Sequence, residues 1–112
     1  MDPLAQRRAE HVALLQEEVE RLVQGLVALG AKKVYQFGSL TRRPPDLLTD
    51  VDLLAIMESD EPFVERLARI YQELGPRVAA DILVYTPQEF EEMRDRPFLR
   101  HVLKTAVLRY AA

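Results

Sequence analysis

The sequence predicts an α/β (α+β) fold in which a small mixed β-sheet is flanked by helices. Two kinds of apolar pattern support this prediction. Apolar residues recur every three or four positions over residues 3–29 and 63–74, as they do on the buried side of amphipathic helices. Nearly continuous apolar runs lie at 51–57 and 78–85, as in strands that are covered on both faces. The helices are therefore expected to pack on a sheet.

Length and composition limit what the chain can be. Its 112 residues suit one domain, spanning 1–112, and 48% hydrophobic with 29% charged residues is typical of a folded protein. Cysteine is absent and the two histidines are isolated, so a bound metal would need oxygen ligands. No apolar run approaches the ~20 residues of a membrane-spanning helix. The first residues also lack the apolar block of a secretion signal, and we expect a cytoplasmic protein without a membrane partner.

The first third of the chain predicts a long helix followed by a short strand. The helix is expected over residues 3–29, with Asp2 as its N-cap and Gly30 as its C-terminal stop. The β-branched and aromatic residues of 33–37 favour a strand. Gly38 then permits a tight turn.

A cationic loop is expected next. Ser39 can cap a short helical segment, but Arg42-Arg43-Pro44-Pro45-Asp46 follows soon after. Two adjacent prolines cannot donate amide hydrogen bonds, so any helix should end after about one turn. The two arginines should therefore lie on an exposed loop.

The middle of the chain predicts a strand, a helix and a second strand. The strand over 51–57 should be central, and the helix over 63–74 should begin near a cap at Ser59 or Asp60, with Pro62 in its first turn. Gly75-Pro76 should end that helix, before the strand at 78–85.

Two short helices and a closing strand are expected in the last part of the chain. Thr86-Pro87-Gln88-Glu89 has the spacing of a capping box, which predicts a helix to about Met93. Residues 98–104 should form another short helix, and 106–110 an edge strand.

Three aspartates stand out because they lie at or in apolar strands. Asp50 and Asp52 alternate along one strand, so their carboxylates should project to the same side with Cα atoms about 6.5 to 7 Å apart. Magnesium is commonly held by one or two carboxylates together with phosphate oxygens. Asp81, the lone charge in the strand at 78–85, is the candidate third ligand. Taken singly, each of these aspartates is more often a turn or cap residue.

The order of these features resembles the minimal nucleotidyltransferase family of the DNA polymerase beta-like superfamily. Its signature is an apolar residue, Gly-Ser, roughly ten further residues, and Asp-apolar-Asp. Phe37-Gly38-Ser39 and Asp50-Val51-Asp52-Leu53 match that signature, and the strand containing Asp81 follows in the expected order. The resemblance covers nearly the whole chain.

The resemblance implies a polymerase beta-like nucleotidyltransferase fold and a reaction that uses two Mg²⁺ ions. A nucleoside monophosphate, AMP from ATP or its equivalent from another nucleoside triphosphate, would pass to a hydroxyl acceptor. The catalytic and metal-binding residues would be Asp50, Asp52 and Asp81. The nucleotide-binding residues would be Gly38, Ser39, Arg42 and Arg43. The family's Ala-Arg-Gly segment after Gly-Ser is replaced here by Leu40-Thr41-Arg42-Arg43-Pro44, which leaves the nucleotide preference open.

Family members often act as the antitoxin beside a helical HEPN protein, so the resemblance implies a toxin–antitoxin pair in which the HEPN partner accepts AMP. A locally basic segment, residues 94–110, is our expected docking surface, and both homo- and hetero-oligomers are compatible with it. The residues expected to take part are Arg96, Arg100, His101, Lys104 and Arg109.

Two alternatives stay open. One is a partner-binding antitoxin with a vestigial nucleotide site, and the other is a small-molecule nucleotidyltransferase. A net charge of -3 without an aromatic-rich basic surface does not favour direct binding to nucleic acid.

Overall fold

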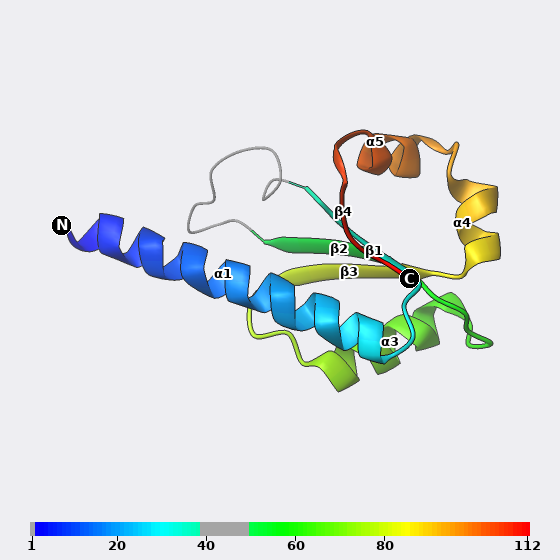
Figure 1. The fold of residues 1–112 in the computed structure, drawn as a ribbon, viewed down its shortest axis with the longest axis horizontal. Coiled ribbons are helices and arrows are strands. Elements are labelled where there is room, and N and C mark those ends of the chain that lie inside the picture. Colours follow the sequence, from blue (N-terminus) through cyan, green and yellow to red (C-terminus); the bar gives the residue numbers. More distant parts are fainter. Residues whose placement is uncertain (1, 39–49) are drawn as a thin grey trace.

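A four-stranded mixed sheet forms the centre of the fold (Figure 1). The computed structural model describes residues 2–38 and 50–112. The strands are β1 (Lys33–Phe37), β2 (Val51–Ile56), β3 (Ala80–Tyr85) and β4 (Val107–Ala111), in the spatial order β3-β2-β1-β4. β1 runs antiparallel to both β2 and β4, whereas β2 and β3 are parallel. The predicted class, a mixed sheet flanked by helices, is confirmed.

Helix α1 (Pro3–Ala28) covers one face of the sheet with its C-terminal half, while its N-terminal half extends beyond the strands (Figure 1). The predicted cap is confirmed, because the Asp2 side chain accepts a hydrogen bond from the Ala5 amide at 2.9 Å. The helix ends as Gly30 takes a φ of 109°, in the left-handed region where a side chain would be strained.

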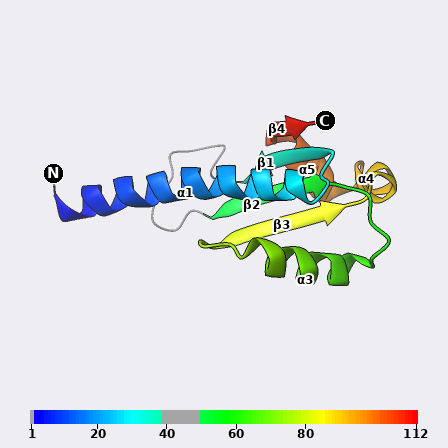
Figure 2. The same ribbon diagram turned by 60° about the horizontal axis from the view of Figure 1, so that its bottom comes forward.

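Helix α3 (Phe63–Leu74) connects β2 to β3 and lies beside α1 on the same face (Figure 2). The predicted cap at Ser59 or Asp60 is wrong. Pro62 occupies the N-cap position without a side-chain hydrogen bond, and the Ser59 hydroxyl instead accepts a hydrogen bond from the Glu61 amide within the preceding turn. Gly75 ends the helix in the left-handed conformation, as expected.

Helices α4 (Pro87–Met93) and α5 (Pro97–Thr105) cover the other face of the sheet (Figure 1). The predicted capping box is present, since the Thr86 hydroxyl accepts from the Glu89 amide and the Glu89 carboxylate accepts from the Thr86 amide. The strand predicted at 106–110 is confirmed as edge strand β4, with bounds shifted by one residue.

The alternation of side chains along the strands divides the apolar residues into two clusters. The larger cluster packs under α1 and α3, and its fully buried members include Leu15, Leu22, Leu26, Val34, Val51, Leu53 and Ile70. The smaller cluster packs under α4 and α5, and its buried members are Leu54, Ile56, Tyr85, Phe90, Leu99 and Val102. Among the residues described, no helix combines the length and apolarity needed to cross a membrane.

Two buried ion pairs join the elements around these clusters. Arg66 of α3, only 2% exposed, donates to the carbonyl of Val84 at 2.8 Å and to the carboxylate of Glu89 at 2.7 Å, and so ties α3 to β3 and α4. Glu18 of α1 pairs with Arg21 at 2.7 Å, and Arg21 also donates to the carbonyl of Leu74 at the end of α3. Each pair therefore holds one helix against its neighbour.

Candidate functional site

The parallel register of β2 and β3 brings two of the three predicted aspartates together. Asp52 is the partner of Asp81 across these strands, and adjacent strands lie about 4.8 Å apart. Val51 and Leu53 are buried in the larger cluster, so Asp52 between them faces the opposite side, toward α4 and α5. Asp81 shares that side because it is in register with Asp52. A sequence pattern therefore becomes a spatial pair of carboxylates.

Gly38 lies directly against Asp52, one member of this pair. It follows β1, whose last residue, Phe37, stands opposite Asp52 in the antiparallel register. Gly38 has a φ of 82°, and a Cβ atom added to it would overlap the Asp52 carboxylate. Two independent constraints, backbone conformation and space, thus require glycine at this position.

The carboxyl group of Asp52 is electrostatically perturbed. Its pKa is raised to about 6, first because burial disfavours the charged form, then because of the negative charge of Asp81 and a hydrogen bond with it, and last because of Asp50. Like charges held this close are typical of sites that bind a cation or exchange a proton. The raised pKa makes Asp52 and Asp81 the candidate pair for such chemistry in this site.

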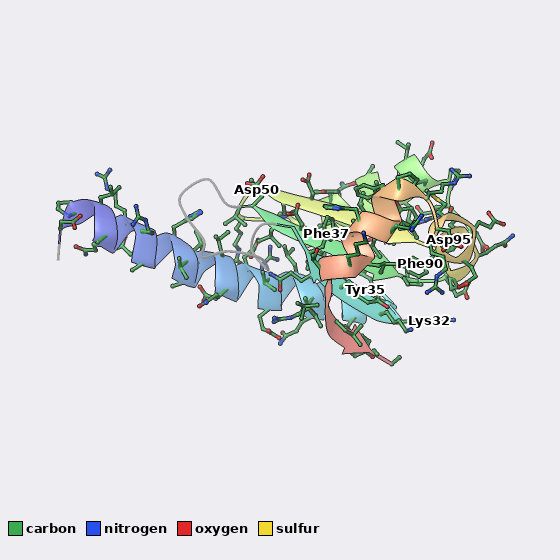
Figure 3. All side chains as sticks on the ribbon, turned by 90° about the horizontal axis from the view of Figure 1, so that it is seen from above. Lys32, Tyr35, Phe37, Asp50, Phe90 and Asp95 are labelled. Carbon is green, nitrogen blue, oxygen red and sulfur yellow. The ribbon has the colours of Figure 1, made fainter. Side chains whose placement is uncertain are left out.

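Asp50 contributes less than the sequence pattern suggests. It lies just before β2 and is exposed, at the end of the sheet where Phe37 also lies (Figure 3). Within residues 2–38 and 50–112, no three acidic or histidine side chains are already arranged as a metal cage. The structure brings together Asp52 and Asp81 closely, with Asp50 near enough to influence the pKa of Asp52.

An open hollow of about 310 Å³ lies over the carboxylate pair. Its walls include Asp52, Asp81 and the apolar side chains of Phe37, Leu83 and Phe98. Phe37 and Phe98 meet edge to face with ring centroids 6.5 Å apart, and Phe98 is 52% exposed. The carboxylates thus have access to solvent beside an apolar wall, which is a common arrangement for a small-ligand site.

Sequence reasoning did not identify Tyr71 or Phe98, although both line this hollow. The spacing of Tyr71 from Leu67 in α3 could have indicated that it points inward, and an aromatic residue just after Pro97 could have indicated a special role for Phe98. Neither signal says which strand the side chain reaches. That information comes only from the packing of α3 and α5 on the sheet.

A second, larger hollow of about 500 Å³ lies toward the other end of the same face of the sheet. Lys33, Tyr35, Phe90 and Arg94 are among its lining residues, and Tyr35 and Phe90 stack at 6.5 Å (Figure 3). Glu91, its one acidic side chain, is paired with Arg94 at 3.2 Å. We assign the candidate chemistry to the smaller of these two hollows, because it is lined by Asp52 and Asp81, the carboxylates of adjacent strands.

Three of the predicted nucleotide-binding residues, Ser39, Arg42 and Arg43, lie outside the described residues. Gly38 is the one member of that predicted set whose position the structure gives.

The residues present fit a divalent cation. Two adjacent carboxylates with a third close by are oxygen ligands of the type that Mg²⁺ prefers, and Mg²⁺ normally completes its shell with water and phosphate oxygens. The close approach of Gly38 leaves no room for a side chain between the backbone and Asp52. Asp50, Asp52 and Asp81 would supply the protein ligands.

The chain was compared with known proteins. A scan against protein-family models matches no family, and a search of curated proteins finds no match. The resemblance to minimal nucleotidyltransferases therefore rests on the motif residues themselves and stays a prediction.

Proposed function

We propose that this protein is a magnesium-dependent nucleotidyltransferase that moves AMP from ATP to a hydroxyl acceptor. The observation that supports the proposal most is the pairing of Asp52 with Asp81 directly beside Gly38, because it joins both halves of the sequence motif at one place. A cytoplasmic location, where ATP and Mg²⁺ are abundant, is part of the same proposal.

The chemistry follows from the roles of the carboxylates. Bound Mg²⁺ would neutralise charge on the triphosphate and on the leaving pyrophosphate. Asp50, Asp52 and Asp81 would hold two such ions, and Asp81, the exposed member of the close pair, would accept the proton of the acceptor hydroxyl. The hydroxyl oxygen bonds to the α-phosphorus while the bond from that phosphorus to the pyrophosphate oxygen breaks. The products are the adenylylated acceptor, pyrophosphate and a proton on Asp81.

The acceptor in this proposal is a hydroxyl group on a HEPN-type protein partner, which the antitoxin would silence by modification. Exposed apolar side chains on α5 and β4 support a docking surface there, since Phe98, Val107 and Leu108 are 52%, 47% and 51% exposed. Exposed Arg100 and Lys104 lie on the same helix as Phe98. This surface borders the hollow over the carboxylates, because Phe98 lines both.

A labelling experiment tests the proposal. Purified protein, MgCl₂, ATP labelled at the α-phosphate and the product of the adjacent gene are incubated together, and transfer of label to the partner is measured. Asp52→Asn and Asp81→Asn should each lower the rate by more than about 100-fold, since even the residues that orient metal ligands are worth 10- to 100-fold. Asp60→Asn, which changes an exposed aspartate with no hydrogen bond or ion pair to a described residue, is the matched control.

The result also separates the proposal from its main alternative. Equal labelling by the Asp52→Asn, Asp81→Asn and Asp60→Asn variants would disprove the site assignment. A wild-type protein that neutralises its partner without labelling it would instead favour an antitoxin that acts by contact alone.

A glycine pair tests the phosphate side of the motif. Gly30 and Gly38 both have positive φ, but an added Cβ meets nothing within 4 Å at Gly30 and overlaps Asp52 at Gly38. Gly30→Ala therefore controls for backbone strain alone. Gly38→Ala should reduce labelling by about 100-fold more than Gly30→Ala, because displacing a catalytic group by about 1 Å can cost that much. Equal losses would show that the contact with Asp52 has no role.

A further inference from the structure

The edge strand β3 is hydrogen-bonded to a helix side chain at the residue before Asp81 and at the residue after it. The hydroxyl group of Tyr71 in α3 donates a hydrogen bond to the carbonyl of Ala80 at 3.0 Å and accepts one from the amide of Ile82 at 2.7 Å. Among the described strands β3 pairs with β2 alone, so these two backbone groups face away from that sheet. Tyr71 therefore takes the place of a neighbouring strand at this point.

Tyr71 is itself well anchored for this task. Its ring packs against the larger apolar cluster under α1 and α3, which fixes the direction of the side chain. The helix that carries it is held by the buried Arg66 and by Arg21. The hydroxyl group thus reaches the strand edge from a rigid support.

β3 needs such support because the carboxylate of Asp81 lies next to the carboxylate of Asp52 on β2. Asp81 and Asp52 are direct partners, and their negative charges repel each other when no cation lies between them. β3 could relieve that repulsion by moving outward, since within residues 2–38 and 50–112 no strand lies on its outer side. Hydrogen bonds on both sides of Asp81 oppose this movement.

Resting on the proposed function, we propose that Tyr71 is a positioning residue that holds Asp81 at the distance from Asp52 needed to bind a divalent cation. The phenolic proton is already donated to Ala80, so Tyr71 acts through the backbone of β3 and does not supply a proton to the reaction. Tyr71 also lines the hollow over the carboxylates, so a displacement of β3 would change the shape of that hollow.

The test measures binding of Mn²⁺ to the purified protein by electron paramagnetic resonance, without ATP or partner. Tyr71→Phe removes only the hydroxyl group and should weaken Mn²⁺ binding by about 10-fold, the lower end of what residues supporting metal ligands contribute. Hydrogen exchange at the Ile82 amide should accelerate in the same variant, since its acceptor is lost. The activity should show a raised requirement for metal.

Two controls separate positioning from general destabilisation. Tyr110→Phe makes the same chemical change on the opposite edge strand, where the hydroxyl has no hydrogen bond to a described residue. Ile70→Val loosens the core next to Tyr71 and leaves the hydroxyl in place. The dissociation constant of both variants for Mn²⁺ should stay within about twofold of the wild-type value, because neither substitution removes a hydrogen bond that supports the metal-binding carboxylates.

The outcomes are distinguishable. If Tyr71→Phe binds Mn²⁺ as tightly as the wild type, or no more weakly than Ile70→Val, the positioning role is overturned while the proposed function stands. If the Asp52→Asn variant binds Mn²⁺ as tightly as the wild type, both the proposed function and the positioning role of Tyr71 are overturned.

Discussion

The two faces of the sheet differ in depth and in chemistry. Under α1 and α3 the residues Leu15, Leu22 and Leu26 have no exposed surface, and the cluster continues along two long helices. Under α4 and α5 the helices are short, and the cluster covers only part of the strands, so that Asp52 and Asp81 face an open hollow. The apolar packing on one face of β2 and β3 can thus compensate for the repulsion between two carboxylates on the other face.

The largest effect on stability is expected when one buried leucine from each face is replaced by alanine and the two losses are compared. Leu22→Ala should lower the free energy of unfolding by about 3 to 5 kcal/mol, because two long helices cannot collapse into the cavity. Leu99→Ala, equally buried at 1% exposure, should cost about 2 kcal/mol, since the short α5 can shift to fill the space. Urea denaturation measures both. Equal costs would show that the two faces are equally rigid.

Arg66 joins the two faces and should give the next largest effect. Arg66→Met keeps the length of the side chain but removes the hydrogen bonds to the carbonyls of Glu61 and Val84 and to the carboxylate of Glu89, which would then keep its bond from the Thr86 amide. We expect a loss of about 2 to 3 kcal/mol, discounted from a fully buried pair because Glu89 is 34% exposed.

Arg69→Met on the same helix is the matched control for Arg66. Arg69 pairs with Glu61 and Glu73 at the surface, where screening by solvent leaves ion pairs with only a small contribution to stability. Thermal and urea denaturation of the two variants should rank them in that order. A larger loss from Arg69→Met would contradict the view that the buried arginine fastens α3 to α4.

A third substitution should raise the free energy of unfolding instead of lowering it. In metal-free protein, Asp52→Asn removes the charge that burial and Asp81 disfavour, so the variant should be more stable by about 1 to 2 kcal/mol, with one pKa unit worth about 1.4 kcal/mol. This range lies below the full conversion of the pKa shift, because Asp52 is partly exposed and solvent screens its charge. Added Mg²⁺ should raise the melting temperature of the wild type and not of the variant. Asp60→Asn should change neither, and a destabilised Asp52→Asn would contradict the repulsion.

The smallest effect is expected on stability at acid pH. It can be tested at one ion pair on each face of the sheet, Glu18–Arg21 and Glu89–Arg66. Hydrogen bonds from Arg21 to Glu18 and from Arg66 to Glu89 hold the pKa of each glutamate below its ordinary value of 4.5. A lowered pKa in the folded state contributes stability above pH 4.5 that is lost as the pH falls through the folded value. Glu18→Gln and Glu89→Gln should therefore each flatten the decline in stability below pH 4.5, measured by urea denaturation. A decline as steep as that of the wild type would exclude these pairs as its cause.

Most elements were predictable because their signals are local. The Asp2 cap, the capping box at Thr86 and the glycine stops at Gly30 and Gly75 all act within a few residues of themselves. The cap of α3 was not predictable in the same way. Ser59 has a capping side chain, but the turn before Pro62 uses its hydroxyl for the Glu61 amide instead.

The candidate site was predictable in composition but not in geometry. The motif identified Asp50, Asp52 and Asp81, yet only the parallel register of β2 and β3 shows which two are neighbours. Arg66 and Tyr71 were overlooked for a related reason. A charged or polar residue in α3 looks like a surface residue until the partners that satisfy it, Glu89 for one and the β3 backbone for the other, are brought from distant parts of the chain.

The place of β4 in the sheet has a consequence for biosynthesis. β4 pairs with β1, with Gln36 opposite Val107, and so joins the earliest strand to the latest among the described elements. A ribosome completes β1, β2, α3 and β3 well before it reaches β4. Throughout that interval β1 has one unpaired edge, which is the kind of edge that other extended chains can pair with. Nascent chains that stall before residue 107 therefore leave this edge of β1 open to pairing with other chains.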